Sequence, residues 1–420
     1  MSSMDILTLD DFDFEDKTVI LRVDINSPID PQTRRIVDDN RILRSLPTIR
    51  ELSDGGARLV MLAHQGDTLD YQNLAPLEQH ASMLSRLLDR PVAYIDDVAG
   101  PAARERVRRL KRGEMLLLDN VRFHTEEVST FRNYVKLSPK EMAKTYIVRN
   151  LAPLGDLYVC DAFAAAHRAA PTLVGFPEVL PAAGGRLFVE EYGILKRVRD
   201  NPERPCVFVL GGAKISDAFG MMGKVLADGT ADRVLTTGLT GLVMLWAAGI
   251  ELGRVPEAYL RDRGLEPFVA QAASLLQKYG ERIVYPEDLA IDDGGRREIP
   301  VSALPVETEL IDIGSRTIAH YASILQEART IFVNGPAGVY ETKAGSLGTE
   351  SLWKAIAEAP GYSVIGGGDT VAAARRFGVV DQMSYVSTAG GALIQFLSGQ
   401  KLPVIEALRR AKQRYTGASA

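Results

Sequence analysis

Short runs of apolar, often β-branched residues recur along the whole chain, and stretches with helical patterning separate them. Near-continuous apolar runs of this length are typical of strands in a parallel sheet whose two faces are both covered by helices. Five runs lie in the first half and six in the second, at residues 18–23, 57–63, 92–95, 115–119 and 157–160, then 206–210, 233–237, 282–285, 330–334, 362–366 and 383–387. We therefore predict an α/β protein with two doubly wound parallel-sheet (Rossmann-like) domains.

A glycine-entered segment separates the two sets of runs. Gly184 and Gly185 precede an amphipathic helix, and Pro202 and Pro205 follow it. This pattern fits a hinge helix and a plain connecting helix equally well. The expected boundaries are an N-terminal domain over 1–183, a connecting hinge helix over 184–204, a C-terminal domain over 205–400 and a terminal segment over 401–420.

Composition excludes several function classes. With 54 acidic and 49 basic residues the net charge is -5, which does not favour nucleic acid as a partner, and the basic run 104–112 is typical of a solvated helix face. Cys160 and Cys206 are too few for a disulfide framework, so we expect a reduced, cytoplasmic protein. No apolar run is long enough to predict a membrane span, the N-terminus lacks the apolar core of a signal peptide, and the histidines show no zinc motif.

Charged and polar side chains follow the strands of the first half. The carboxyl ends of parallel strands meet at one edge of a sheet, where ligands bind. The residues after successive runs are Asp24 and Asn26, then Arg41, His64, Arg122 with His124 close by, and Arg168. One such arginine is more often part of a surface ion pair, but four basic groups at one edge predict a small, strongly anionic ligand.

Glycine-rich loops follow the strands of the second half. They are "GGAK" (211–214), "GLTG" (238–241), "NGPAGVYE" (334–341), "GGGDT" (366–370) and "AGGA" (389–392). Neither a P-loop nor a dinucleotide fingerprint is present. A capped helix after a tight turn explains residues 366–370 alone, but the recurrence of such loops favours backbone amides that meet phosphates. We therefore expect phosphoryl transfer between an anion site and a nucleotide site.

The order of these motifs resembles that of the phosphoglycerate kinase family over nearly the whole chain. It runs "RVDINSP", "AHQG", "NVRFH", "DAFAAAHRA", "GGAKISD", "NGPAGVYE", "GGGDT", "STAGGA". The short "AHQGD" loop and the "RTIAHY" segment are more similar to archaeal members. The resemblance implies reversible phosphoryl transfer between ATP and the carboxylate of 3-phosphoglycerate, giving ADP and 1,3-bisphosphoglycerate, with Mg²⁺ as cofactor. It also implies a terminal helix that returns to the N-terminal domain, in a monomer or homodimer.

The resemblance assigns roles to individual positions. For 3-phosphoglycerate they are Asp24, Ile25, Asn26, Arg41, His64, Gln65, Gly66, Asp67, Arg122 and Arg168. For the nucleotide they are Gly211, Lys214, Gly238, Gly314, Asn334, Pro336, Glu341, Gly367, Gly368, Asp369 and Thr370, with Gly238, Leu239 and Gly314 beside the adenine and Asp369 on the metal. The catalytic positions are Arg41, Lys214, Gly368 and Gly391.

Three positions depart from the family pattern. Asp67 stands where the family usually has an arginine, Ala218 where many members have a second lysine, and Cys160 in place of an asparagine. The first two changes leave open a catalytically silent protein that binds anions and nucleotides. A nucleotide-dependent kinase of another small phosphorylated acid is a second alternative.

Overall fold

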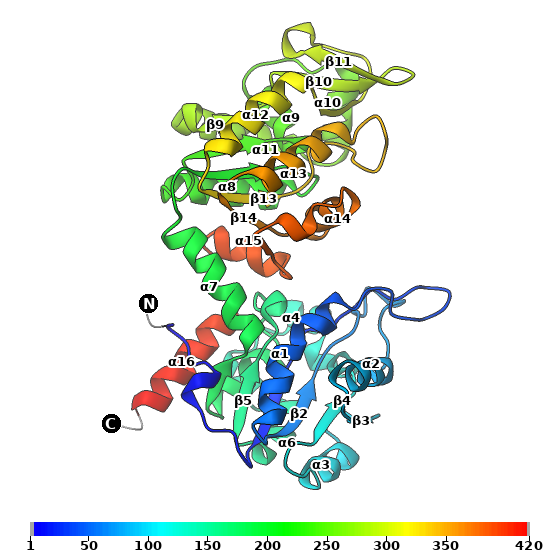
Figure 1. Cartoon of the computed structure of the whole chain (residues 1–420), viewed down its shortest axis with the longest axis vertical. Helices are drawn as coiled ribbons and strands as arrows, with labels where there is room; N and C mark the ends of the chain where they lie inside the picture. Colours follow the sequence, from blue (N-terminus) through cyan, green and yellow to red (C-terminus); the bar gives the residue numbers. More distant parts are fainter. Residues whose placement is uncertain (1–3, 418–420) are drawn as a thin grey trace. The chain divides into compact units, whose positions relative to one another are not determined.

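A computed structural model of the chain describes residues 4–417, which form two compact units. The N-terminal unit combines the chain up to Gly193 with the chain from Lys401 onward, and the C-terminal unit spans Ile194–Gln400. Figure 1 colours both units along the sequence, and each is described by itself below. The helix α7 (Arg186–Asp200) contains the division point.

The N-terminal unit is built on a six-stranded sheet in which every pair of neighbours is parallel. Its strand order is β3-β4-β2-β1-β5-β6. The strands are β1 (Thr18–Arg22), β2 (Arg58–Leu62), β3 (Val92–Ile95), β4 (Met115–Leu118), β5 (Leu157–Cys160) and β6 (Ala182–Gly184). All five residues of β1 are buried, which explains why the run is apolar without alternation.

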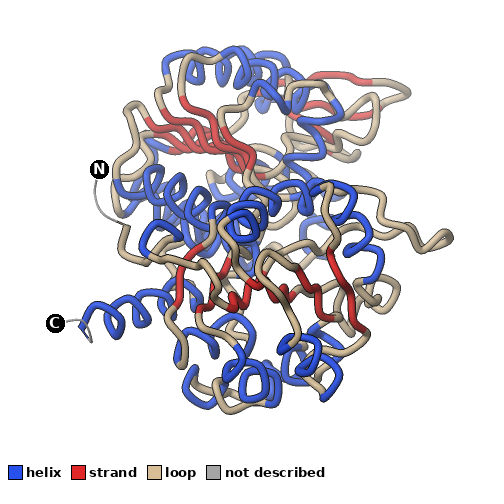
Figure 2. Tube along the Cα trace, turned by 60° about the horizontal axis from the view of Figure 1, so that its bottom comes forward, coloured by secondary structure: helices blue, strands red, loops and turns tan. Residues whose placement is uncertain are grey.

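Helices cover both faces of this sheet, as Figure 2 shows. They are α1 (Asn40–Asp54), α2 (Glu78–Leu88), α3 (Pro101–Arg108), α4 (Ser129–Tyr134), α5 (Pro139–Met142), α6 (Tyr146–Leu151) and α16 (Pro403–Gly417). The last of these belongs to the N-terminal unit, where Arg409 donates to the carboxylate of Asp5 at 2.5 Å.

The C-terminal unit also contains a six-stranded parallel sheet, in the order β15-β14-β13-β7-β8-β9. The strands are β7 (Cys206–Leu210), β8 (Arg233–Thr236), β9 (Ile283–Val284), β13 (Thr330–Asn334), β14 (Tyr362–Ile365) and β15 (Tyr385–Val386). The helices are α8 (Ile215–Ala227), α9 (Gly238–Ala247), α10 (Arg254–Asp262), α11 (Pro267–Tyr279), α12 (Ser315–Glu327), α13 (Leu347–Glu358), α14 (Gly368–Arg376) and α15 (Gly391–Leu397). The predicted fold class, two doubly wound parallel sheets, is confirmed.

Two features of the strand pattern were not predicted. A three-stranded antiparallel sheet, β11-β10-β12, consists of Arg296–Pro300, Asp288–Asp292 and Leu310–Ile313. Gly184, expected at the start of the connecting helix, instead ends β6, and α7 begins two residues later. No helix in the described part of the chain combines the length and apolar character that a transmembrane span requires.

Candidate active site

A buried arginine organises the carboxyl edge of the N-terminal sheet. Arg22 is the last residue of β1 and is only 2% exposed. Its Nη2 lies 3.0 Å from Nδ1 of His64, and its Nε donates to the hydroxyl of Thr172 at 3.1 Å. Because a guanidinium has only donors, Nδ1 of His64 is the acceptor and the ring proton is on Nε2. Arg22 stands at the strand end just before Asp24 and Asn26, but the sequence does not show which partners such a charge inside an apolar run finds.

The loop after β1 meets α1 and the loop after β2. The carboxylate of Asp24 accepts a hydrogen bond from Nη1 of Arg41 at 2.5 Å, and it is nearly buried while Arg41 is half-buried. The amide oxygen of Asn26 accepts the backbone N–H of Gly66 at 3.0 Å. These contacts bring predicted residues from three segments of the chain together.

Arg122 closes the same edge from the loop after β4. It is 6% exposed, and its Nη1 donates to the carbonyl of Gly66 and lies 3.4 Å from the carboxylate of Asp67. Asp67 also accepts from the hydroxyl of Ser129 at 3.1 Å. The unusual carboxylate at position 67 is therefore neutralised within the unit.

A cavity of the N-terminal unit is lined by Asp67, Arg132, His167 and Arg168, among others. Nε of Arg168 lies 3.4 Å from Nε2 of His167, whereas its Nη1 is buried and has no hydrogen-bond partner among the described residues. Burial lowers the pKa of Arg168, because removing its charged guanidinium from water costs free energy.

The positive charges around His64 are strong enough to change its titration. Burial first, and then the charges of Arg22, Arg168, Arg41 and Arg132, hold the pKa of His64 well below its usual range. A protein rarely assembles so many cations without a counter-charge. The geometry indicates a site for an anion with several oxygens, bound by forked guanidinium donors.

Two residues of the predicted acid site have their side chains elsewhere. Ile25 is fully buried in the hydrophobic core of the N-terminal unit. The buried amide of Gln65 accepts the backbone N–H of Ser27 at 2.9 Å and donates to its carbonyl at 2.8 Å. Their side chains therefore hold the loops together, and only their backbone groups remain for a ligand.

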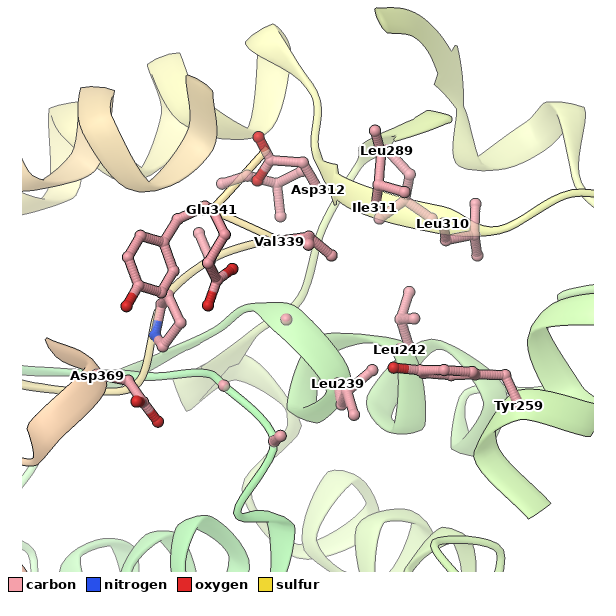
Figure 3. Close-up of a pocket in the computed structure, with 18 of the residues that line it drawn as sticks. Leu239, Leu242, Tyr259, Leu289, Leu310, Ile311, Asp312, Val339, Glu341 and Asp369 are labelled. Carbon is pink, nitrogen blue, oxygen red and sulfur yellow. The ribbon is translucent and has the colours of Figure 1, made fainter. Parts of the chain in front are cut away.

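The C-terminal unit contains a cavity of about 280 Å³, near the lower end of the volumes of roughly 300–1,000 Å³ that small-molecule sites have. Figure 3 shows the carboxylates of Glu341 and Asp369 on one side of it and the side chains of Leu239, Leu310 and Tyr259 on the other. The cavity thus has an acidic end and an apolar end. Of the predicted nucleotide residues it includes Gly238, Pro336, Glu341 and Asp369.

The acidic end is held by two loops that are tied to each other. The amide nitrogen of Asn334 donates to the carbonyl of Gly366 at 3.0 Å. The hydroxyl of Thr370 accepts the N–H of Gly335 at 2.8 Å, and Thr370 is only 1% exposed. Asn334 and Thr370 therefore fix the loops that follow β13 and β14, rather than lining the cavity themselves.

Glycines 367 and 368 have different local requirements. Gly367 has φ +93°, and a Cβ there would lie 2.8 Å from Nδ2 of Asn334, so the backbone requires glycine. A Cβ at Gly368 would meet nothing within 4 Å. Gly368 begins α14, whose first N–H groups are available to an anion.

The remaining predicted nucleotide residues lie outside the lining of the cavity. Gly211 packs against Thr237 and the carbonyl of Pro336, where a Cβ would clash. Gly314 caps α12, and a Cβ there would lie 2.3 Å from the carboxyl group of Asp288. Leu310 and Ile311 line the apolar end of the cavity, and Gly314 is not among its lining residues, so its place beside the adenine stays a prediction.

Lys214 and Gly391 stand at helix starts in the C-terminal unit. Lys214 precedes α8 and is exposed, and its side chain makes no ion pair or hydrogen bond with any residue that the structure describes. Gly391 begins α15. Ala218, where many family members have lysine, is 3% exposed.

The acidic end is suited to a metal–phosphate complex but not to a metal alone. Burial and the carboxylates of Glu341 and Asp369 raise the pKa of Tyr340, so both negative charges lie close enough to act on the same side chain. Within residues 4–417 no three His, Cys, Asp or Glu side chains are grouped to hold a metal ion. Mg²⁺ characteristically takes one or two carboxylates and completes its shell with phosphates and water, which fits Asp369, an exposed residue in the first turn of α14.

Comparisons with known proteins agree with this architecture. The family model "Phosphoglycerate kinase" matches residues 9–400. The chain belongs to the phosphoglycerate kinase family. It is 46% identical over 413 residues to the phosphoglycerate kinase of Methanobacterium bryantii, covering 98% of this chain and 99% of that one. It is also 46% identical to that of Methanothermobacter thermautotrophicus over 406 residues, covering 96% and 97% of the two chains.

Solved structures of the phosphoglycerate kinase family share the fold. That of the Pyrococcus horikoshii enzyme matches with a TM-score of 0.87 and 39% identity, covering 97% of this chain and 100% of that one. That from Coxiella burnetii matches with a TM-score of 0.81 and 31% identity, covering 96% and 99%. The resemblance to the family, and to its archaeal members, is confirmed. The chain is thus a phosphotransferase. Its reaction transfers a phosphoryl group between ATP and the carboxylate of 3-phosphoglycerate, in either direction.

Proposed function

We propose that the two substrates of this reaction are divided between the units, with 3-phosphoglycerate on the N-terminal unit and the magnesium nucleotide on the C-terminal unit. The observation that carries the proposal is the contrast in charge between the two sites. One edge gathers arginines with unsatisfied donors, and the other cavity joins two carboxylates to an apolar wall. A phosphorylated acid suits the first, and a base with a metal-bound polyphosphate suits the second.

On the N-terminal unit, Arg168 and Arg122 bind the phosphate oxygens, and Asp24 and Asn26 accept from the hydroxyl of the substrate. Asp24 also orients Arg41, whose guanidinium is half-buried and directed by a 2.5 Å ion pair. His64 donates through Nε2, because Nδ1 is occupied by Arg22.

On the C-terminal unit, the apolar end of the cavity takes the adenine and Glu341 accepts from the ribose hydroxyls. The N–H groups at the start of α14, after Gly367, take the phosphates. Mg²⁺, bound by Asp369 and phosphate oxygens, would neutralise charge on the polyphosphate.

The chemistry requires little from the protein beyond positioning and neutralisation. The accepting carboxylate has a pKa of about 4 or below and is ionised at neutral pH, so no general base is needed. Arg41 and Lys214 stabilise the transferred group as it moves, with the backbone N–H groups of Gly368 and Gly391. Lys214 is suited to this because its side chain makes no hydrogen bond or ion pair within the described residues that would have to break first.

Direct transfer requires the reacting atoms to approach within about 3.5 Å, so the two bound substrates must be brought together. We propose that α7 and the segment around Ser387 and Thr388 act as the hinge, with Gly184 and Gly185 at the N-terminal side. The functional domains are then 1–183 and 205–400, joined by 184–204, with 401–420 supporting the N-terminal one.

The cellular setting follows from the same chemistry. Both substrates are small molecules of the cytoplasm, where we place the protein. The two cysteines fit this location, because burial raises the pKa of Cys160 to about 11 and that of Cys206 to about 12, so both remain thiols at neutral pH. Neither nucleic acid nor a membrane is required as a partner, and a monomer or a homodimer would serve the reaction.

The test is turnover of the purified chain with ATP, Mg²⁺ and 3-phosphoglycerate, coupled to reduction of the acyl phosphate by a dehydrogenase. We expect turnover with 3-phosphoglycerate and none with unphosphorylated glycerate, because the arginines need a phosphate to bind. Faster turnover with glycerate, or ATP consumption independent of the acid, would contradict the assignment.

A further inference from the structure

The acid site has a negative charge where the family usually has a positive one. The carboxylate of Asp67 is already engaged, since it accepts from the backbone N–H of Thr68 at 2.7 Å and the hydroxyl of Ser129 at 3.1 Å and lies 3.4 Å from Arg122. A carboxylate does not attract a phosphate, and the negative charge of Asp67 partly neutralises the positive charge of Arg122. A phosphate at this edge would lack one of its usual guanidinium partners unless another residue supplies it.

Arg132 of α4 is placed to be that partner. Ser129 and Arg132 are three residues apart and therefore lie on one face of the helix. The bond from Ser129 to Asp67 fixes this face toward the acid site, and Arg132 lines the same cavity as Asp67, His167 and Arg168.

The side chain of Arg132 is unsatisfied within the N-terminal unit. It makes no ion pair or side-chain hydrogen bond with any residue between 4 and 417, and its Nε is buried without a partner. Glu127, whose carboxylate acts on the charge of Arg132, is already used, because its two oxygens accept the backbone N–H and the hydroxyl of Thr172 at 2.6 and 2.9 Å.

Two guanidiniums facing one cavity repel each other. Burial lowers the pKa of Arg132, while the carboxylates of Glu127 and Asp67 oppose that change and Arg22 adds to it. Arg168, which lines the same cavity, has a buried Nη1 without a partner among the described residues. An oxyanion between the two would satisfy both sets of donors.

We propose that Arg132 binds the phosphate group of 3-phosphoglycerate together with Arg168, replacing the arginine that the family usually has at position 67. The inference rests on the proposed assignment of the acid to this unit. It identifies α4, which carries no family motif, as the element that adapts this site to a carboxylate at position 67.

The test uses the full chain and titration calorimetry with 3-phosphoglycerate. We expect Arg132→Ala to weaken binding of the acid by about 10- to 100-fold, the range for loss of a hydrogen bond between charged groups. Binding of magnesium ATP should be unchanged. Arg132→Lys should recover only part of the affinity, because an ammonium lacks the fork. Arg108→Ala, an exposed arginine of α3 in the same unit, is the control with the same change in charge and should bind the acid as the wild type does.

A rescue variant separates a phosphate contact from a structural role. In the double variant Asp67→Arg, Arg132→Ala the family's arginine is restored, and affinity for 3-phosphoglycerate should return to within a few-fold of wild type. Wild-type affinity in Arg132→Ala, or equal weakening of both ligands, would overturn the role of Arg132. A wild-type chain that binds no 3-phosphoglycerate is a different result, which would refute the assignment of the acid site itself.

Discussion

The glycines at the start of α14 offer a matched pair of substitutions with opposite expectations. Gly367 has φ +93° and ψ 141°, a region that residues with a Cβ avoid, at a strain of about 1–3 kcal/mol. The new Cβ would also lie 2.8 Å from Nδ2 of Asn334 and displace its hydrogen bond to Gly366, worth about 1 kcal/mol. We therefore expect Gly367→Ala to destabilise the C-terminal unit by about 2–4 kcal/mol.

Gly368→Ala is the contrasting variant. Nothing lies within 4 Å of a Cβ built at this position, and the residue begins a helix. Its effect on the free energy of unfolding should stay within about 0.5 kcal/mol. If phosphates approach this backbone closely, the methyl group should nevertheless weaken binding of magnesium ATP by roughly 10- to 100-fold.

Denaturant titration followed by tryptophan fluorescence measures the first quantity, because Trp246 and Trp353, the two tryptophans of the chain, both belong to the C-terminal unit. Calorimetry with magnesium ATP measures the second. Unchanged stability in Gly367→Ala would refute the loop geometry. Unchanged nucleotide affinity in Gly368→Ala would refute the placement of the phosphates.

Three further outcomes are expected. Arg168→Ala should mainly raise the KM for 3-phosphoglycerate, whereas Arg41→Ala should mainly lower kcat; steady-state kinetics that show one pattern for both would reject these roles. Burial lowers the pKa of His80 to about 4, so its neutral form contributes up to about 3 kcal/mol of stability above pH 6.5, which is lost as the pH falls toward 4. Denaturation at several pH values should therefore show a smaller loss of stability on acidification in His80→Gln, and an unchanged profile would contradict this. Solution X-ray scattering should show a fall in radius of gyration only when both substrates and Mg²⁺ are present, and full compaction with 3-phosphoglycerate alone would exclude the hinge.

Much of the fold could be predicted because its parallel strands are buried on both faces. A run such as Thr18–Arg22 is apolar at nearly every position, so it stands out without an alignment. β6 could not be predicted because its three residues, Ala182–Gly184, are small and lie among prolines and glycines. β11, Arg296–Pro300, is largely exposed and charged, so it reads as a loop.

The sites were predictable to the extent that strand ends and family motifs mark them. The contacts that orient them were not, because they depend on tertiary packing. Arg22 ends the apolar strand β1 and positions His64, and Arg132 lies on a six-residue helix far along the chain from Asp67. At Gly314 the structure shows a reason for glycine that the motif does not reveal, because this residue caps α12 and packs closely on Asp288.

The division of the two substrates between the units is tested most directly by Asp369→Ala, with both ligands titrated separately into the wild type and the variant. Turnover should fall by two or more powers of ten and the affinity for magnesium nucleotide should drop, since the variant removes the carboxylate proposed to bind the metal. The affinity for 3-phosphoglycerate should remain that of the wild type, because we propose that its site lies on the N-terminal unit. Comparable weakening of both ligands in the folded variant would contradict the account.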